Sequence, residues 1–143
     1  MDEAAVLGLW DRCGLLRPQN DPRADIQRKL QVSPELFLVG TLDSEVIATC
    51  MAGYDGHRGW IYYFGVDPKY QKRGYGRAIM DHAERLLRKR GCPKINLQVR
   101  SSNRNVIEFY QRLGFVTDDV LSMGKRLISD KKVSPPQPNS MKG

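Results

Sequence analysis

Residues 66–77 constrain this chain most, because two closely spaced glycines follow a β-type run of residues and open a helical one. Glycine reaches backbone conformations closed to other residues and lets a ligand approach the main chain. The first amides of a helix have no intrahelical partner and carry the positive end of the helix dipole, so such a turn can bind phosphate. Lys72, Arg73 and Arg77 add positive charge around Gly74 and Gly76.

Three phosphate-binding patterns compete for this turn. A P-loop needs Gly-x4-Gly-Lys-Ser/Thr, which is absent. A dinucleotide-binding turn needs a third glycine where this chain has Ile79. The third pattern, Gln/Arg-x-x-Gly-x-Gly, matches residues 71–76. On this hexapeptide alone, an ordinary glycine-rich turn between a strand and a helix stays open as the alternative.

The spacing of apolar residues predicts two early helices, a three-stranded meander and then a β-α-β-α-β order. This order predicts an α+β fold with a mixed, mainly antiparallel central sheet flanked by helices. The expected helices are 6–13, 25–32, 76–90 and 103–113, and the expected strands are 36–41, 45–53, 60–66, 95–99 and two short closing strands within 115–128.

A chain of 143 residues fits one domain with one core. We place this domain at residues 1–128 and expect a disordered tail at 129–143, because that stretch is rich in proline and poor in large apolar residues. The N-terminus does not resemble a signal peptide, and no run approaches the roughly 20 apolar residues that span a bilayer. We therefore expect a cytoplasmic protein without a membrane partner.

Cysteine content and charge narrow the function further. Cys13, Cys50 and Cys92 are odd in number and lack metal-ligand spacing, so we expect no metal, and small buried side chains in preference to catalytic thiols. The net charge of +7 favours an anionic partner such as a phosphorylated cofactor, although it also serves solubility. No nucleic-acid-reading motif is present, so we expect no nucleic-acid partner.

A second motif decides the interpretation of the glycine turn. It comprises Arg100-x-Ser102-Asn103 followed by Phe109-Tyr110-x-x-Leu113-Gly114-Phe115. With both motifs, the sequence resembles the GNAT superfamily of N-acetyltransferases over about residues 4–128. Within it, residues 15–18, 53–59, 91–95 and 124–128 are most similar to the YpeA-type bacterial acetyltransferases.

The resemblance implies an enzyme that transfers the acetyl group of acetyl-CoA directly to a primary amine in a ternary complex. The amine would belong to a small molecule or to a peptide or protein N-terminus. Residues 15–32 and the last strands would line the acceptor pocket. A homodimer is compatible with the sequence.

The resemblance also implies roles for particular residues. Backbone groups at the end of the third strand would pair with the pantetheine arm, the glycine turn would wrap the pyrophosphate, and Asn103 would bond the coenzyme near the pantetheine. Tyr110 would be catalytic and protonate the departing thiolate, for which a phenol is already protonated at pH 7; a purely structural core aromatic is the alternative. The implied coenzyme-binding residues are Phe64, Gly65, Val66, Gln71, Lys72, Arg73, Gly74, Tyr75, Gly76, Arg77 and Asn103.

The chain departs from the family pattern at the catalytic base. In the ribosomal-protein-alanine branch a glutamate accepts the proton of the amine, and the matching residue here is Gln98, which cannot. Asp55 or His57 could replace it, Tyr62 or Tyr63 could orient a water, or the amine could arrive neutral. The departure also leaves open a non-catalytic acyl-CoA-binding or regulatory module.

The chain departs a second time at its N-terminus. Family members begin with a strand before the first helix, and here only about three residues precede that helix. We therefore expect either that an edge strand of the sheet is missing or that the true start of the protein lies upstream.

Overall fold

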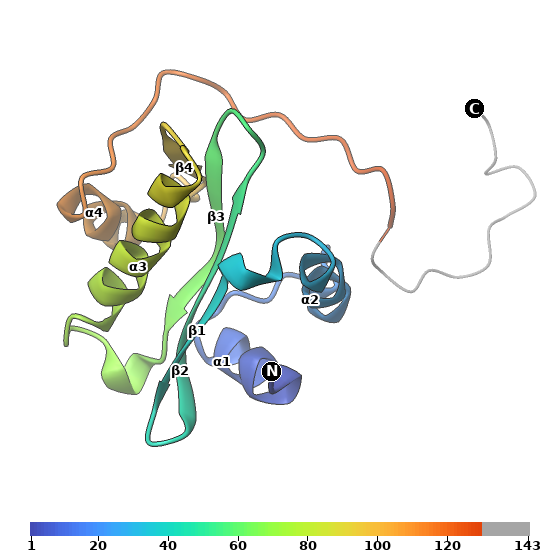
Figure 1. Cartoon of the computed structure of the whole chain (residues 1–143), viewed down its shortest axis with the longest axis vertical. Helices are drawn as coiled ribbons and strands as arrows, with labels where there is room; N and C mark the ends of the chain where they lie inside the picture. The colour runs from blue at the N-terminus through green and yellow to red at the C-terminus, as the bar shows by residue number, and fades with distance from the viewer. Residues whose placement is uncertain (130–143) are drawn as a thin grey trace, which may run out of the picture.

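The computed structural model describes residues 1–129 (Figure 1). The chain forms one mixed sheet with helices packed on both of its faces. In chain order the helices and strands are α1 (Glu3–Arg12), α2 (Pro22–Leu30), the 3-10 turn η1 (Pro34–Leu36), β1 (Phe37–Leu42), β2 (Glu45–Tyr54), β3 (Gly59–Val66), the 3-10 turn η2 (Pro68–Tyr70), α3 (Tyr75–Lys89), β4 (Ile95–Leu97) and α4 (Arg104–Arg112).

The first two helices begin at capping aspartates. The Asp2 side chain accepts a hydrogen bond from the Ala5 amide at 3.0 Å, and Asp21 accepts one from the Ala24 amide at 3.1 Å. Pro22 occupies the first turn of α2, where its missing N–H is not needed. Because of this cap, α2 begins three residues before the start predicted from apolar spacing.

The sheet has the strand order β1-β2-β3-β4, with antiparallel pairing up to β3 and a parallel β3–β4 pair. This confirms the predicted mixed, mainly antiparallel α+β sheet. The parallel pair joins only residues 59–61 to residues 95–97. Beyond Ile61, no strand in the described part of the chain pairs with that edge of β3. Within residues 1–129 no strand precedes α1, as expected, and β1 forms one edge of the sheet.

A β-bulge interrupts β3 at the point where it leaves β4. Tyr63 has a positive φ of 48°, and the β2–β3 register shifts between Thr49 and Met51. Thr49 is fully buried and bridges the bulge to α1: its hydroxyl donates to the Tyr63 carbonyl at 2.8 Å and accepts from the Trp10 indole at 2.9 Å. The Trp10 ring also stacks on Tyr63 with centroids 3.8 Å apart.

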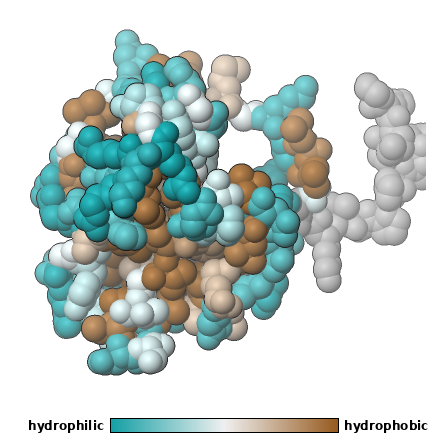
Figure 2. All heavy atoms as spheres, viewed as in Figure 1, coloured by the Kyte–Doolittle hydropathy of each residue, from teal (hydrophilic) through white to brown (hydrophobic). Residues whose placement is uncertain are grey.

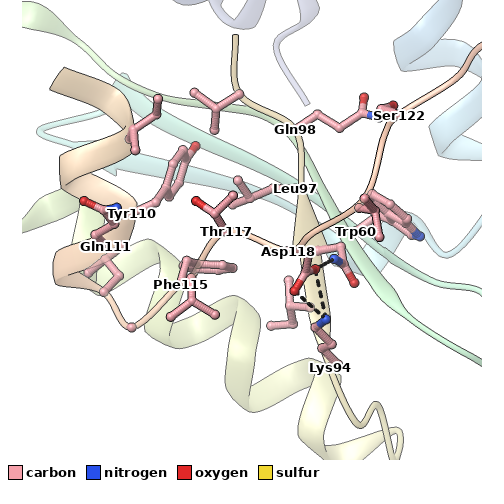
Figure 3. A pocket seen from close by; sticks show the side chains of 18 of the residues that line it. Trp60, Lys94, Leu97, Gln98, Tyr110, Gln111, Phe115, Thr117, Asp118 and Ser122 are labelled. Carbon is pink, nitrogen blue, oxygen red and sulfur yellow. Dashed lines mark hydrogen bonds and ion pairs between the residues drawn. The ribbon is translucent and has the colours of Figure 1, made fainter. Parts of the chain in front are cut away.

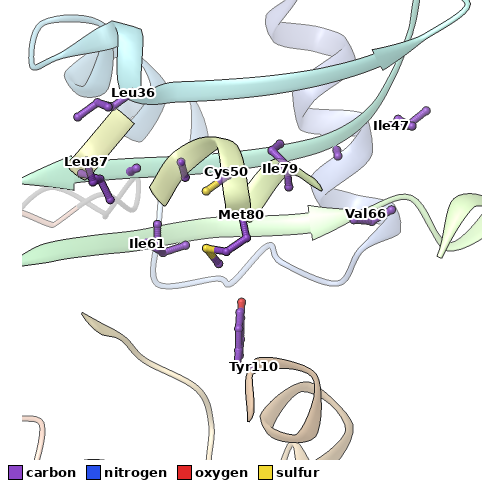
Figure 4. Packing of buried hydrophobic residues seen from close by; sticks show 12 residues of the cluster. Leu36, Ile47, Cys50, Ile61, Val66, Ile79, Met80, Leu87 and Tyr110 are labelled. Atoms are coloured by element: carbon purple, nitrogen blue, oxygen red, sulfur yellow. The ribbon is translucent and has the colours of Figure 1, made fainter. Parts of the chain in front are cut away.

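Each face of the sheet has its own apolar cluster. The larger cluster joins β2 and β3 to α3, and the buried Tyr110 of α4 belongs to it (Figure 4). The smaller one packs α1 and α2 on the opposite face through Trp10, Ile26 and Met51. The outward face of α3 is polar, as its amphipathic sequence predicts (Figure 2). None of the described helices is long and apolar enough to cross a bilayer.

The prediction of two closing strands within 115–128 is wrong. This segment is irregular, and side chains instead of backbone groups attach it to the β4 region: Lys94 and Asn96 bond Asp118, and Gln98 bonds Ser122. Residues 117–119 and Gly124 include types that sheets disfavour. Large apolar side chains of the segment are exposed, namely Val116, Val120, Leu121, Met123, Leu127 and Ile128. The predicted disordered tail lies outside the described residues from position 130 onward.

We expect Thr49→Val to destabilise the protein by about 2 kcal/mol, because it leaves the buried Trp10 N–H without its acceptor and removes the bond to the Tyr63 carbonyl. Urea denaturation followed by circular dichroism would measure the loss. Thr41→Val, on an exposed position of β1, is the matched control and should change stability little. Equal effects of both variants would contradict a bridging role for Thr49.

Candidate functional site

Three segments that are distant in sequence meet beyond the point where β3 separates from β4. They are the end of β3, the turn that opens α3, and α4 (Figure 1). Gly74 caps α3 with φ of 86°, a conformation that L side chains rarely adopt. The first intrahelical bond runs from the Ala78 amide to the Gly74 carbonyl at 3.0 Å. The amides of Tyr75, Gly76 and Arg77 therefore precede the helical ladder and are available to an anion.

Gly76 has a packing role that differs from the one expected from sequence. A Cβ at this position would lie 3.0 Å from the Phe109 Cζ and 3.6 Å from the Val66 Cγ2. The residue is buried, with φ outside the left-handed region. Gly76 thus allows the start of α3 to approach α4 and β3 closely, and Gly74 is the glycine that the backbone of the turn requires.

Polar contacts fix the turn to the end of β3. The Gln71 side chain donates from Nε2 to the Val66 carbonyl at 3.0 Å. Asp67 is 1% exposed and accepts hydrogen bonds from the Lys69 amide and from Arg12 Nε, each at 3.0 Å. The bond from the Lys69 amide, with Arg12 as a further cause, lowers the pKa of the Asp67 carboxyl below its usual value. Asp67 is therefore an ion at neutral pH.

The turn carries positive charge without nearby acidic sequence neighbours. Between Asp67 and Asp81 every charged residue is basic. The Arg73 guanidinium lies 5.6 Å from the centroid of the Tyr70 ring, and the Tyr70 and Tyr75 rings meet edge to face at 6.3 Å. Arg77 Nη2 donates to the Arg112 carbonyl at the end of α4, 3.2 Å away. Lys72 is exposed, with φ of 64°.

Tyr110 lies in an aromatic group between α4 and β3. Its ring centroid is 5.8 Å from that of Phe64, 5.4 Å from Phe109 and 5.6 Å from Phe115. Its hydroxyl points from α4 toward Ile61 and Met80 (Figure 4). Within residues 1–129 this hydroxyl makes no hydrogen bond, and because no fully buried side-chain oxygen there lacks a partner, it keeps contact with solvent-accessible space. Burial of most of the residue, with a smaller contribution from Cys50, raises the pKa of Tyr110 above its usual value. The phenol is therefore fully protonated at neutral pH and can donate its proton to a ligand.

An open cavity of about 800 Å³ reaches Tyr110 from the side of β4 (Figure 3). It runs between the end of α3, β4, α4 and residues 113–122, and the Lys94–Asp118 ion pair spans part of it. The cavity does not include the glycine turn. Tyr110 therefore lies between two regions, the turn at the end of β3 and the cavity beside β4.

Asn103 occupies the N-cap of α4. Its Oδ1 accepts a long hydrogen bond of 3.4 Å from the Val106 amide, and the residue is exposed. The carbonyl oxygen of this side chain thus supports its own helix. The Nδ2 group of the Asn103 side chain makes none of the hydrogen bonds found among residues 1–129, so it is available to a ligand.

The candidate bases either lie far from the glycine turn or bond to other side chains. Asp55 and His57 lie in the turn before Gly59, at the opposite end of β3 from the glycine turn, about 20 Å along an eight-residue strand. Amide hydrogen bonds from Arg58 and His57 also lower the pKa of Asp55, which makes it a weak proton acceptor. Gln98 is engaged with Ser122, and the Tyr63 hydroxyl donates to Asp25 Oδ2 at 2.5 Å on the α2 side.

Two of the three thiols, those of Cys13 and Cys50, are poorly suited to act as nucleophiles. Burial raises the pKa of Cys50 to about 12 and that of Cys13 to about 11, so both are neutral thiols at physiological pH. Cys13 Sγ donates to the Val66 carbonyl at 3.4 Å. No group of three potential metal ligands occurs in the part of the chain that the structure describes.

Comparison with known proteins identifies the family of this chain. Residues 5–115 match the acetyltransferase (GNAT) family. The chain belongs to the GNAT family. It is 50% identical to an acetyltransferase of Pectobacterium atrosepticum over 131 residues, which covers 92% of this chain and 93% of that one. An acetyltransferase of Sodalis glossinidius is 52% identical over 132 residues, with the same two coverages.

Solved structures agree with this family assignment. The ribosomal-protein-S18-alanine N-acetyltransferase of Escherichia coli is similar with a TM-score of 0.65 and 26% identity, over 79% of this chain and 70% of that one. An AAC(6')-Iy structure in complex with a CoA-S-monomethyl-acetylneamine bisubstrate analogue has the same fold, with a TM-score of 0.65 and 20% identity over 84% and 91% of the two chains. The GNAT chain described here is thus an acetyl-CoA-dependent acyltransferase. Its assignment to the YpeA type stays a prediction.

Sequence reasoning missed the residues that hold the glycine turn in place. The Asp67-Pro68 pair is a recognisable cap signal, since aspartate favours the position before a turn and proline its first residue. Arg12 carries no such signal, because it precedes Asp67 by 55 residues and only the folded chain brings them together.

We expect Asp67→Asn to flatten the acid side of the stability profile. Because the native pKa of Asp67 is lowered from an unfolded value of about 3.9, the ionised group stabilises the fold above that pH and loses this effect as the pH falls through the native pKa. Thermal unfolding between pH 7 and pH 3 should show Asp67→Asn less stable than wild type at pH 7, with a smaller decrease toward pH 3. Asp119→Asn, at an exposed position, should keep the wild-type profile.

Proposed function

We propose that this protein transfers the acetyl group of acetyl-CoA directly to a primary amine, in a ternary complex, with Tyr110 as the catalytic residue. The acceptor is a small-molecule amine or a peptide or protein N-terminus. One observation carries the proposal: the ring of Tyr110, whose hydroxyl is protonated, lies against Phe64, where β3 has lost its β4 neighbour.

The coenzyme site uses the end of β3 and the glycine turn. The free edge of β3 at Phe64, Gly65 and Val66 accepts the pantetheine arm as an added strand. The backbone amides at the start of α3, which have no intrahelical hydrogen-bond partner, bind the pyrophosphate. The side-chain amide of Asn103 bonds the coenzyme near the pantetheine. The residues proposed to surround the pyrophosphate are Gln71, Lys72, Arg73, Gly74, Tyr75, Gly76 and Arg77.

The Tyr110 hydroxyl acts on the leaving sulfur. When the amine has attacked the thioester carbonyl, the carbon–sulfur bond breaks and the sulfur takes up negative charge. A thiol has a pKa of about 8.5, which is below that of a buried phenol. Tyr110 therefore donates a hydrogen bond to the sulfur as the charge develops. The proton that the thiol finally carries is balanced by the proton that the attacking nitrogen loses, so the phenol ends the reaction protonated.

The amine enters this site neutral or loses its proton to water. Gln98 cannot act as a base, and Asp55 and His57 are at the far end of β3. The same lack motivates the second candidate, a non-catalytic acyl-CoA-binding or regulatory module. Calorimetric binding of acetyl-CoA without acetyl transfer to a broad panel of amines, polyamines, aminoglycosides and peptides would favour that module over the enzyme.

We expect Tyr110→Phe to lower kcat roughly 100-fold, because the phenyl ring keeps the packing and loses the proton donor. The dissociation constant of acetyl-CoA, measured by calorimetry, should stay within about twofold of wild type, since the ring makes the apolar contacts. Tyr54→Phe removes a hydroxyl bonded to Gly56 and Gly91, away from the site, and should leave kcat unchanged. An unaltered kcat in Tyr110→Phe would remove the residue from the mechanism.

We expect Gly74→Ala to weaken acetyl-CoA binding several-fold, because alanine disfavours the left-handed backbone that shapes the anion site. Gly91→Ala is the matched control: Gly91 follows the other end of α3 with φ of 81°, and an added Cβ at either glycine meets no atom within 4 Å. Both variants should lose similar stability in thermal unfolding. Similar acetyl-CoA affinities in the two variants would contradict the assignment of the pyrophosphate to the turn at Gly74.

A further inference from the structure

Residues 12–15, where α1 ends, contact three successive residues, the last two of β3 and Asp67 after them, in reverse chain order. Arg12 bonds the Asp67 carboxylate, Cys13 bonds the Val66 carbonyl, and Leu15 lies 3.0 Å from where a Cβ of Gly65 would be. These are the residues that lead from the free edge of β3 into the glycine turn. The short segment that ends α1 therefore contacts the chain at the point where β3 leads into the proposed coenzyme site.

Asp67 is the residue through which this contact reaches the turn. One carboxylate oxygen accepts from the Lys69 amide and the other from Arg12 Nε. The Asp67 amide donates to the Ile47 carbonyl at 2.7 Å, and its carbonyl accepts from the Tyr70 amide at 2.8 Å. The 3-10 turn Pro68–Tyr70 is thus fixed at Asp67, and it leads directly to residues 71–74.

Arg12 lies at the end of a helix that is firmly anchored to the sheet. The buried Trp10 anchors α1 to the sheet, and the amides of Cys13, Gly14 and Leu15 close the C-terminus of the helix by bonding the carbonyls of preceding residues. The Asp67 carboxylate is buried. Removing the partner of a buried charge destabilises the fold, because the charge is left uncompensated. Without Arg12, Asp67 would reorient toward solvent and the turn that it caps would move with it.

We propose that Arg12 is a positioning residue for the coenzyme: it holds Asp67, and through Asp67 the turn that binds the pyrophosphate. The inference depends on the coenzyme site proposed above. It predicts a change in acetyl-CoA binding, with chemistry at saturation preserved, because Arg12 acts on the turn and not on Tyr110.

The test compares three substitutions. Arg12→Met keeps the aliphatic stem and removes the donor. Arg12→Gln places an amide nitrogen where arginine has Nε, which is the atom that bonds Asp67, and so keeps a neutral hydrogen bond while removing the charge. Arg23→Met is the matched control, because Arg23 pairs with Glu3 between α1 and α2 and does not contact Asp67.

We expect Arg12→Met to raise the dissociation constant and KM for acetyl-CoA about tenfold, with kcat at saturating coenzyme within twofold of wild type. Arg12→Gln should raise both constants about threefold, and Arg23→Met should change neither. Calorimetry and steady-state kinetics supply the values, and hydrogen exchange should show faster exchange at residues 69–76 in Arg12→Met.

Affinity for acetyl-CoA in Arg12→Met equal to that of wild type or of Arg23→Met overturns the proposal. If Arg12→Met does not fold, Arg12→Gln decides, and wild-type affinity in that variant overturns the proposal as well. A fall in kcat at saturation with unchanged affinity also overturns it. If Gly74→Ala and Gly91→Ala bind acetyl-CoA equally, the proposed coenzyme site itself fails, and this outcome is independent of the Arg12 series.

Discussion

The separation of β3 from β4 after three residue pairs is the constraint on which the rest of the structure depends. If the parallel pairing of β3 with β4 continued to Val66, β4 would bond the backbone N–H and C=O groups of β3. It would also fill the space that Phe64 and Tyr110 now border. The bulge at Tyr63 coincides with the separation and is held by the buried Thr49. Hydrogen-bonding groups at an open strand edge require a partner, which in this fold a ligand can provide.

The two glycines of the turn illustrate what a sequence motif can and cannot specify. Gly74 was predictable, because only a residue tolerant of positive φ opens a helix from this turn. Gly76 was predicted at the right place for a different reason: its lack of a side chain admits the Phe109 ring. The motif covers both the turn proposed to bind the anion and the close contact of α3 with α4, and spacing alone does not distinguish the two.

Local sequence signals predicted most of the fold, but they failed where the structure depends on contacts between residues that are distant in sequence. Apolar periodicity located the four helices and the strands of the meander, because each of these buries one face. The segment after Gly114 has β-type residues, yet its polar side chains bond Lys94, Asn96 and Gln98 and no ladder forms. Arg12 and Thr49 were unpredictable for the same reason, since their partners are remote in sequence and depend on tertiary packing.

The two regions of the candidate site differ in the charge and protonation of their side chains. Around the glycine turn the charges are fixed and basic, with the one buried carboxylate, Asp67, held as an ion by Lys69 and Arg12. Around Tyr110 the surroundings are aromatic, and burial keeps its hydroxyl protonated. In the binding mode proposed above, the anionic coenzyme would lie where the side chains are basic, and its sulfur would lie beside a neutral donor. Phe64 and Val66 of β3 contact the two regions, so the geometry of β3 would set the distance between the proposed pyrophosphate site and Tyr110.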